Sequence, residues 1–230
     1  TVFLERYVAR ARHVEIQILG DTHGALIHLG ERECSIQRRH QKIIEESPSP
    51  IVDHEMRAAM GDAAIALGQA MGYQSAGTVE FLVDDTTREF FFLEVNTRLQ
   101  VEHPVTEEVT GIDIVRAQIL ISEGKSLAEA TGTDHQNKVN LDGHAMQCRI
   151  TTEDPSNNFI PDYGRITAYR GATGMGIRLD GGTAYSGAVI TRYYDSLLEK
   201  VTAWSPTPEA TIARMDRALR EFRIRGVSTN

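Results

Sequence analysis

The sequence predicts an α+β protein whose strands are mostly antiparallel. Paired segments of alternating or apolar residues predict hairpins, apolar residues at helical spacing predict amphipathic helices, and a polar stretch near residue 130 divides the chain. The 230 residues, 41% of them hydrophobic, are enough for one large core or two smaller ones. We therefore exclude the disordered and fibrous classes.

The first half is predicted to form two hairpins. Residues 13–19 alternate with period two, and a turn containing Gly and Asp leads to the apolar residues 25–29. Residues 77–83 and 89–96 form the second pair and are joined by a polar turn.

Two helical regions accompany these hairpins. Apolar residues recur at helical spacing within residues 51–71, and Gly72 stands where the helix should end. Pro104 is well placed to begin a second helical region, because proline is favoured in the first turn. This region is expected to run, with an interruption at Gly111, to about Glu123.

A change of composition divides the chain into domains. Residues 125–142 are polar and contain glycine, so we expect a linker between a domain at residues 1–124 and a domain at residues 143–230. The second domain is predicted to close with a helix at 208–222. Before this helix it is rich in short predicted strands, at residues 143–153, 164–169, 176–179, 188–193 and 197–204.

Charge and cysteine content limit the partners and the compartment. The formal net charge is −8, which gives no general attraction for nucleic acid or an anionic membrane, so neither is expected as a partner. No apolar run reaches the roughly 18 to 20 residues of a membrane-spanning helix. Cys34 and Cys148 lack metal-binding spacing, and we expect free buried thiols in a reducing, cytoplasmic setting.

The stretch with the most chemical information runs from Glu94 to Pro104. A solvated strand face would explain any one of its polar residues, but the Phe-Phe-Phe-Leu run at 90–93 predicts a strand buried on both faces. A carboxylate there is costly unless it is paired or binds a metal. An extended chain would point every second side chain the same way, and these positions hold Glu94, Asn96, Arg98, Gln100 and Glu102.

Glu80 is a second lone carboxylate in an apolar strand. Two carboxylates on adjacent antiparallel strands suit Mg²⁺, which takes a few protein oxygens and completes its octahedron with water and phosphate. Glu80 and Glu94 share a face only if paired residue numbers in the hairpin have an even sum. A three-residue turn or a bulge would make them diagonal neighbours roughly 7 to 8 Å apart, whereas a four-residue turn without a bulge would separate them.

A basic cluster, Gln-Arg-Arg-His-Gln-Lys, occupies residues 37–42 of this acidic chain. Such a run is typical of a solvated turn, but its place between a strand-like segment and a helix favours fixed cations beside the metal pair, which would suit phosphate or bicarbonate. Arg149 is a similar lone cation on a predicted strand, and His103 and His144 are expected to be structural. No GxxxxGK[ST] or GxGxxG loop occurs.

These motifs resemble the biotin carboxylase component of biotin-dependent carboxylases, which are ATP-grasp enzymes. The resemblance rests on residues 12–17, 37–42, 94–107 and 147–149 and covers essentially the whole chain. It implies an ATP-grasp antiparallel sheet with helices, followed by the family's β-rich C-terminal domain. In this family an α/β domain and a glycine-rich lid precede the equivalent of Thr1, so we expect a fragment that hydrolyses ATP poorly by itself.

The resemblance implies roles residue by residue. ATP would be held at its base, ribose and phosphates by Glu5, Val8, Leu82, His13, Gln37 and His40. Mg²⁺ or Mn²⁺ would be bound by Glu80, Glu94 and Asn96. Bicarbonate would be surrounded by Lys42, Arg98, Val101 and Arg149, with Glu102 as its general base. Arg6 stands where many members carry Lys, and a guanidinium fork would make a different contact there.

The implied reaction is the ATP-dependent carboxylation of biotin on a carrier domain. Glu102 would deprotonate bicarbonate, which would attack the γ-phosphate to form carboxyphosphate, and this would break down to CO₂ and phosphate. The phosphate would take the N1′ proton of biotin, and Arg98 would stabilise the enolate-like oxygen. Lys42, Arg98 and Arg149 would hold the anions.

The resemblance also implies partners: a biotin carboxyl carrier domain, a carboxyltransferase domain or subunit, and a second copy of the chain in a homodimer. The acceptor stays open, because residues 157–166 and 221–227 look like pyruvate carboxylases whereas 96–98 with 103–105 look like acyl-CoA carboxylases. Two alternative functions remain, another ATP-grasp carboxylate or ammonia ligase and a non-catalytic fragment that dimerises or docks the carrier.

Overall fold

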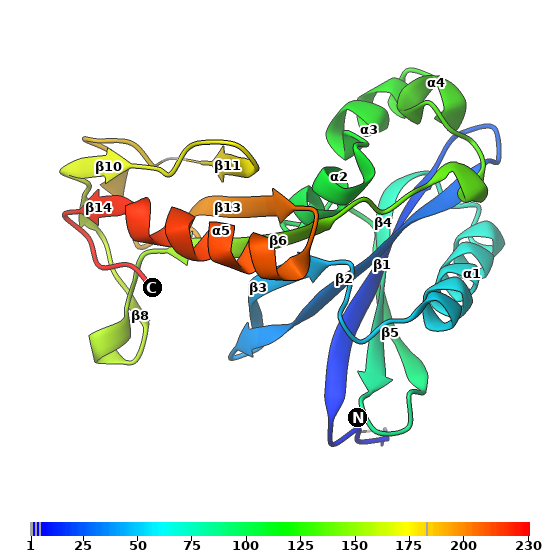
Figure 1. Cartoon of the computed structure of the whole chain (residues 1–230), viewed down its shortest axis with the longest axis horizontal. Coiled ribbons are helices and arrows are strands. Elements are labelled where there is room, and N and C mark those ends of the chain that lie inside the picture. Colours follow the sequence, from blue (N-terminus) through cyan, green and yellow to red (C-terminus); the bar gives the residue numbers. More distant parts are fainter. Residues whose placement is uncertain (1, 3, 5, 183) are drawn as a thin grey trace. The chain divides into compact units, whose positions relative to one another are not determined.

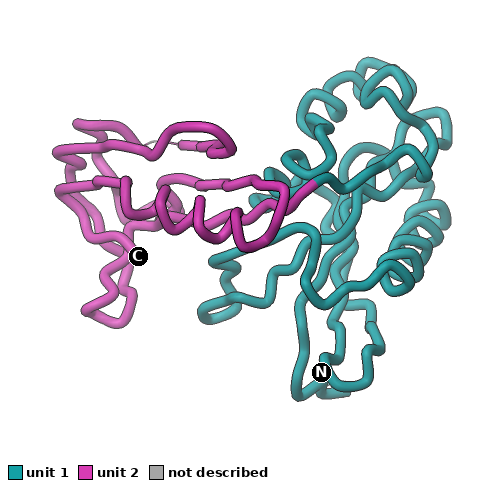
Figure 2. The backbone as a smooth tube through the Cα atoms, viewed as in Figure 1, with its two compact units in different colours: residues 1–142 teal, residues 143–230 magenta. Residues whose placement is uncertain are grey.

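The computed structural model describes residues 2, 4, 6–182 and 184–230. They form two compact units, residues 1–142 and residues 143–230, which Figure 2 shows in different colours. Each unit combines helices with antiparallel strands, as the α+β prediction requires (Figure 1). Over these described ranges no helix is long and apolar enough to cross a membrane. Glu5, a predicted nucleotide contact, lies outside the described residues.

In unit 1 the strands follow the spatial order β3-β2-β1-β4-β5, and each is antiparallel to the next. Both predicted hairpins are confirmed, but strand β3 was not predicted. It follows a tight turn in which Arg39 and His40 have φ values of 52° and 64°, the left-handed backbone that two-residue hairpin turns require. The bounds are β1 (Ala11–Gly20), β2 (Leu26–Arg38), β3 (Gln41–Ser47), β4 (Ser75–Asp84) and β5 (Phe90–Asn96).

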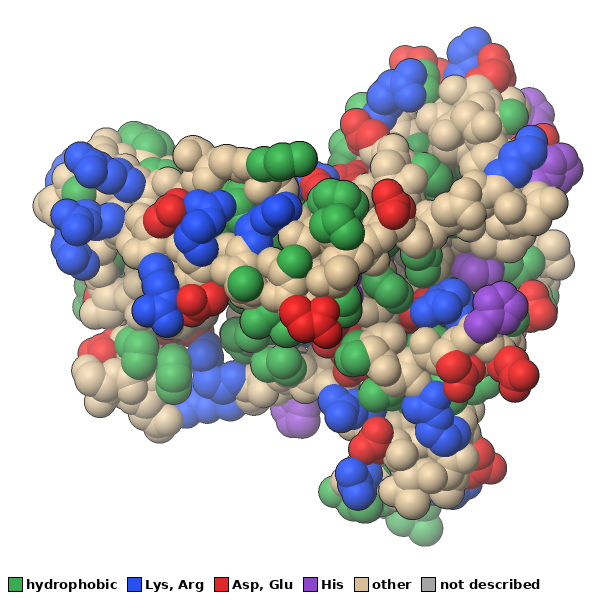
Figure 3. Space-filling view, in the orientation of Figure 1, with side chains coloured by type: hydrophobic (Ala, Val, Ile, Leu, Met, Phe, Trp, Pro, Cys, Tyr) green, Lys and Arg blue, Asp and Glu red, His purple; other side chains and the backbone are tan. Residues whose placement is uncertain are grey.

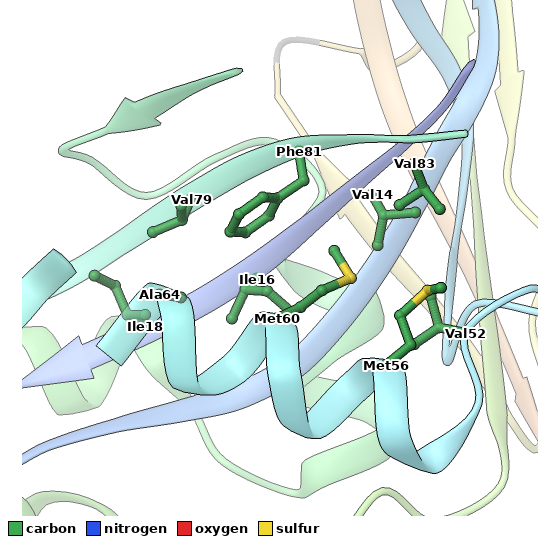
Figure 4. Packing of buried hydrophobic residues seen from close by; sticks show 10 residues of the cluster. All are labelled: Val14, Ile16, Ile18, Val52, Met56, Met60, Ala64, Val79, Phe81 and Val83. Atoms are coloured by element: carbon green, nitrogen blue, oxygen red, sulfur yellow. The ribbon is translucent and has the colours of Figure 1, made fainter. Parts of the chain in front are cut away.

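One face of these strands is covered by the predicted amphipathic helix, α1 (His54–Ala70). The Asp53 side chain accepts a hydrogen bond from the backbone N–H of Met56 and so begins the helix. Figure 4 shows the resulting core, in which residues of α1 pack against alternate residues of β1 and β4. Its buried members are Val14, Ile16, Ile18, Val52, Met56, Met60, Ala64, Val79, Phe81 and Val83. The intervening strand residues therefore face the opposite side.

The predicted second helical region consists of α2 (His103–Thr110) and α3 (Ile114–Ser122), separated by Gly111 with a φ of 69°. The polar stretch 124–142 contains the short helix α4 (Leu127–Thr131) and a 3₁₀ turn at Gln136–Lys138. It packs into a second core of unit 1, which includes Leu19, Ile27, Leu29, Ile114, Ile121, Leu127 and Ala130.

Unit 2 is rich in strands, as predicted, and the predicted helix is present, but a short strand that was not predicted follows it. Its longer strands lie in the order β11-β13-β6, and α5 (Pro208–Glu221) packs on them through Met215 and Ala218. Their bounds are β6 (His144–Thr151), β11 (Ile177–Gly181) and β13 (Leu197–Ser205). Three short pairs complete the unit: β7 (Glu153–Asp154) with β8 (Ile160–Pro161), β9 (Gly164–Arg165) with β12 (Val189–Ile190), and β10 (Ala168–Arg170) with β14 (Arg223–Arg225). A 3₁₀ turn at Pro155–Asn157 follows β7.

Positive side chains gather on part of unit 2. In the space-filling view they lie over α5 and over the end of the unit formed by β10 and β14 (Figure 3). Arg217 and Arg220 are paired with acidic residues one helical turn away, at 2.8 Å in both cases. The exposed Arg223 and Arg225 extend this local positive region in a chain that is acidic overall.

Asp21 links the β1–β2 turn to the start of α4 through hydrogen bonds. Its buried carboxylate accepts hydrogen bonds from the backbone N–H groups of His23, Ala25 and Leu127, at 2.9, 2.9 and 2.7 Å. Burial alone would raise the pKa of Asp21, but these hydrogen bonds outweigh it and lower the pKa below its usual value. The ionised side chain is therefore the stabilising form.

We predict that Asp21→Ala lowers the free energy of unfolding by about 1 to 3 kcal/mol at neutral pH, because buried backbone donors lose a charged acceptor. Since the folded-state pKa is lowered, the carboxylate contributes fully above about pH 4, the ordinary range of an aspartate. Its contribution is lost as pH falls through the lowered pKa. Urea unfolding of wild type, Asp21→Ala and the exposed control Asp62→Ala across pH 3 to 7 tests this. A deficit of Asp21→Ala that did not shrink in acid would contradict it.

Candidate active site

The face of the unit 1 strands opposite α1 carries buried polar groups. His13, Glu15 and Gln17 alternate along β1 with the core residues. Glu15 lies directly opposite Arg32 of β2 on one side and Glu80 of β4 on the other. Glu15 and Arg32 are fully buried, and Glu80 is nearly so. Charges withdrawn from water in this way must be paired, so the contacts among them decide what the face can do.

A bulge in the second hairpin brings two carboxylates together. Glu80 pairs with Glu94, whereas the next residue of β4, Phe81, pairs with Phe92, so Leu93 is the extra residue. The paired numbers therefore have an even sum at Glu80, which confirms that the two carboxylates share a face. They are direct cross-strand neighbours rather than the diagonal neighbours expected for a bulge.

The prediction that residues 90–93 form a strand buried on both faces is wrong. Strand β5 is the last in the spatial order, and the side chains of Phe92 and Leu93 are 57% and 45% exposed. A strand at this position has a neighbour on one side only, which leaves room for solvent around Glu94.

Asn96 bridges the two carboxylates. Its Nδ2 donates to Oε1 of Glu80 at 3.1 Å and to Oε1 of Glu94 at 3.0 Å. Both oxygens thus converge on one point, which a hydrogen-bond donor now occupies. Carboxylate and amide oxygens are the ligands that Mg²⁺ and Mn²⁺ prefer, so these three residues fit a divalent ion once the amide presents its oxygen.

Lys42 holds a second set of carboxylates. Its Nζ lies 2.6 Å from Oε2 of Glu15, 3.0 Å from Oε1 of Glu80 and 2.5 Å from Oε1 of Glu102. Burial would lower the pKa of Lys42, but the negative charges of Glu15 and Glu102 raise it above its usual value. The ammonium is therefore charged, and it fixes Glu102, whose side chain is 3% exposed.

Glu80 is ionised for a related reason. Burial would raise its pKa, but the hydrogen bond from His13 and the charge of Lys42 lower the pKa well below its usual value. The His13 Nε2 atom lies 2.8 Å from Oε2 of Glu80, and Gln100 donates to Oε1 at 2.8 Å. Glu80 can thus serve as an anionic ligand at neutral pH.

Two other groups of potential metal ligands occur on this face: His13 with Glu15 and Glu80, and Glu15 with Cys34 and Glu102. Lys42 contacts every carboxylate of both groups, so a metal ion there would have to displace its ammonium, whereas in the Glu80–Glu94 pair Lys42 contacts Glu80 only. Burial also raises the pKa of the Cys34 thiol well above its usual value, so it is not a thiolate.

The structure brings most of the predicted unit 1 site residues together. Gln37 lies beside His13, with Nε2 3.1 Å from Nδ1, and the predicted base contact Leu82 is opposite His13 on β4. Val101 is half-buried beside Glu102. His40, in contrast, is an exposed residue of the turn between β2 and β3.

The remaining predicted residues lie outside the strands of unit 1 or in unit 2. Val8 precedes β1, outside any strand. Arg98 is exposed and donates to the carbonyl of Leu99 at 3.2 Å. Arg149 lies on β6 of unit 2, opposite Lys200 of β13.

The expectation that residues 94 to 102 all point the same way is wrong beyond Asn96. Strand β5 ends there, and the chain turns before α2 begins at His103. Arg98 consequently faces solvent, whereas Gln100 and Glu102 are buried at the polar face. The turn, rather than an extended strand, delivers Glu102 to Lys42.

Sequence reasoning missed two central residues of this face, Glu15 and Arg32. Glu15 occurs in the alternating segment 13–19, where its burial could have been inferred from the apolar residues around it. Arg32 is flanked by Glu31 and Glu33, and such a charged run is typical of a solvent-exposed segment.

Comparisons with protein families match both units. Residues 1–130 match the family described as "Carbamoyl-phosphate synthase L chain, ATP binding domain", and residues 147–230 match "Biotin carboxylase C-terminal domain". "Pyruvate carboxylase 1" of Caenorhabditis elegans is 52% identical over 230 residues, which are the whole of this chain and 19% of that protein. The chain thus spans about a fifth of the length of the curated relatives it matches.

Solved structures give the same result. A complete multifunctional pyruvate carboxylase from Rhizobium etli matches with a TM-score of 0.96 and 61% identity, over 100% of this chain and 23% of that one. The biotin carboxylase domain dimer of 2-oxoglutarate carboxylase from Hydrogenobacter thermophilus, in complex with MgADP, ADP and bicarbonate, matches with a TM-score of 0.93 and 44% identity. That match covers 98% of this chain and 48% of the other.

We predict that Glu94→Gln weakens Mn²⁺ binding at least about tenfold, because the divalent ion loses one of two anionic ligands; even residues behind the ligands are worth about that much. Titration of Mn²⁺ followed by electron paramagnetic resonance measures the affinity. Glu89→Gln is the matched control, since Glu89 is exposed next to the same strand and the charge change is identical. Equal weakening in both variants would indicate a general field effect rather than ligation.

Proposed function

This chain belongs to the family of carbamoyl-phosphate synthase L chain ATP-binding domains, continued by a biotin carboxylase C-terminal domain, and we propose that it carboxylates biotin at the expense of ATP and bicarbonate. One observation carries the proposal. Glu102 is a buried carboxylate held by the charged Lys42, close to the carboxylate pair that suits a divalent ion. A general base, a fixed cation and a metal site side by side are what bicarbonate activation by ATP needs.

The first step would join bicarbonate to the γ-phosphate of ATP. Glu102 removes the proton of bicarbonate, whose oxygen attacks phosphorus and displaces ADP to give carboxyphosphate. Lys42 holds Glu102 in place and offers positive charge to the anion, and Arg98 and Arg149 are proposed to add to it. A divalent ion bound by Glu80, Glu94 and Asn96 would spread the charge of the phosphates.

In the second step carboxyphosphate would break down to CO₂ and phosphate. The phosphate takes the N1′ proton of biotin, and N1′ then forms its bond to CO₂. Arg98 stabilises the negative charge that develops on the ureido oxygen, and its exposed position leaves it accessible to a biotin that arrives from a carrier. Carboxybiotin is the product.

The nucleotide is proposed to lie where β1 begins and β4 ends. His13 and Gln37 contact each other, Leu82 lies opposite His13, and Val8 and His40 are near the ends of neighbouring strands. The 2-oxoglutarate carboxylase domain with bound MgADP and bicarbonate supports ATP, a divalent ion and bicarbonate as ligands here. Glu5 is proposed for the adenine from the family resemblance alone.

The larger assembly is proposed from the relatives. They are multidomain pyruvate carboxylases and a carboxylase whose biotin carboxylase domain is described as a dimer, which supports a carrier domain, a carboxyltransferase and a homodimer as partners. Pyruvate is favoured over an acyl-CoA as the acceptor, because the most similar of these relatives are pyruvate carboxylases. Cys34 and Cys148 are both buried thiols, which supports a reducing compartment such as the cytoplasm.

Two other functions are less well supported. A different ATP-grasp ligase would not need the biotin carboxylase C-terminal domain that residues 147–230 match. A non-catalytic docking fragment would have no reason to keep Glu80, Glu94, Lys42 and Glu102 buried or paired on one face, since an unused cluster of this kind costs stability.

We predict that Glu102→Gln lowers bicarbonate-dependent, biotin-stimulated ATP hydrolysis by about 10²- to 10⁴-fold, the usual contribution of a general base. The measurement uses a protein that joins this chain to the family's N-terminal domain and lid. Glu55→Gln, at an exposed position of α1, is the control for an equal change of charge. Hydrolysis indifferent to bicarbonate would indicate another ligase, and MgATP binding without turnover would favour a docking role.

A further inference from the structure

Arg32 is the largest fully buried polar side chain among the described residues of unit 1, with an exposed fraction of 0%. All three of its side-chain nitrogens donate hydrogen bonds to other side chains. The acceptors lie on β1, β4, α2 and the turn before α2: Glu15 at 2.5 Å, Gln17 at 2.7 Å, Thr78 at 3.1 Å, Gln100 at 3.3 Å and Thr106 at 3.0 Å. The planar guanidinium thus fixes several segments at once.

Each of three partners continues to a residue of the proposed site. Glu15 accepts from Arg32 with Oε1 and from Lys42 with Oε2, so it bridges the two cations. Gln100 accepts from Arg32 with Oε1 and donates from Nε2 to Glu80. Thr106 belongs to α2, the helix that begins immediately after Glu102.

Stability alone does not account for this arrangement. A buried ion pair is commonly no more stabilising than apolar side chains of the same volume, because both charges lose their hydration. Five directional hydrogen bonds, however, leave each partner a single orientation. An apolar residue at position 32 could fill the space but could not orient Glu15 or Gln100.

We propose that Arg32 is a positioning residue for biotin carboxylation. It orients Glu15 and Gln100, and these hold Lys42 and Glu80 in register with Glu102, the proposed base. Arg32 itself touches no substrate. The inference rests on the proposed function and adds to it a residue that acts only through the side chains it orients.

Arg57 provides a matched control. It forms a two-point ion pair with Glu31, with both N–O distances at 2.7 Å, and Glu31 is fully buried. Glu31 is the neighbour of Arg32 on β2, so this pair lies on the opposite face of the same strand. Its loss should destabilise unit 1 in a comparable way without disturbing the site.

The test compares Arg32→Met, Arg32→Lys and Arg57→Met in a protein that joins this chain to the family's N-terminal domain and lid. For Arg32→Met we expect kcat of bicarbonate-dependent ATP cleavage, per folded molecule, to fall about 10- to 100-fold, the usual effect of removing a residue behind the reacting groups. The KM for ATP should change little, because none of the Arg32 partners is a proposed nucleotide contact. Arg57→Met should lower the Tm as well, with kcat and KM unchanged.

If Arg32→Met does not fold, Arg32→Lys tests whether Arg32 positions the site. Lysine keeps the charge beside Glu15 but lacks the fork that reaches Gln100 and Thr106, so kcat should again fall while the protein stays folded. Wild-type kcat in Arg32→Lys, or an equal loss in Arg32→Met and Arg57→Met, would overturn the inference. An unmodified protein without bicarbonate-dependent ATP cleavage would instead overturn the proposed function, and the inference with it.

Discussion

The polar face of unit 1 depends on the neutralisation of buried carboxylates by the fully buried Arg32 and the partly buried Lys42. Glu15, Glu80 and Glu102 carry three negative charges, and Arg32 and Lys42 return two positive charges through contacts of 2.5 to 3.0 Å. One negative charge remains, and Glu94 next to Glu80 adds a second. A divalent cation would bring this cluster to neutrality. The arrangement of charges that allows the carboxylates to be buried therefore also favours the binding of a divalent ion.

The charged cluster and the apolar core can share the same strands because successive side chains of a strand point to opposite faces. Period-two alternation sends Val14 and Ile16 of β1 into the α1 core and Glu15 between them to the site. A slip of one residue would exchange the two sets, so the apolar core fixes the register of the charged face. The site also depends on the bulge at Leu93, because it converts an odd pairing into the even pairing that aligns Glu94 with Glu80.

Periodicity was sufficient to predict both hairpins and α1, because core burial repeats along these segments, whereas Pro104 and Gly111 predicted the start and the interruption of the second helical region. It could not reveal β3, since Arg39 and His40 adopt left-handed backbone without the Gly or Asn that usually announces such a turn. It also predicted an extended row as far as Glu102, whereas the chain turns after Asn96. The pairing of Glu80 with Glu94 was predicted because both carboxylates lie on the two strands of one hairpin. Arg32 was missed because Glu15, Gln100 and Thr106 come together only in the folded chain.

Strand β2 shows how one segment can serve the fold and the site separately. Glu31 and Glu33 lie on the α1 side, where Arg57 and the hydroxyl of Ser49 satisfy them. Arg32 between them lies on the other side and is satisfied by Glu15. Charges of opposite sign therefore alternate along β2, and each is paired on its own face. Because the two networks share a strand but draw on different side-chain partners, the geometry of the site and the stability of the α1 face can change independently.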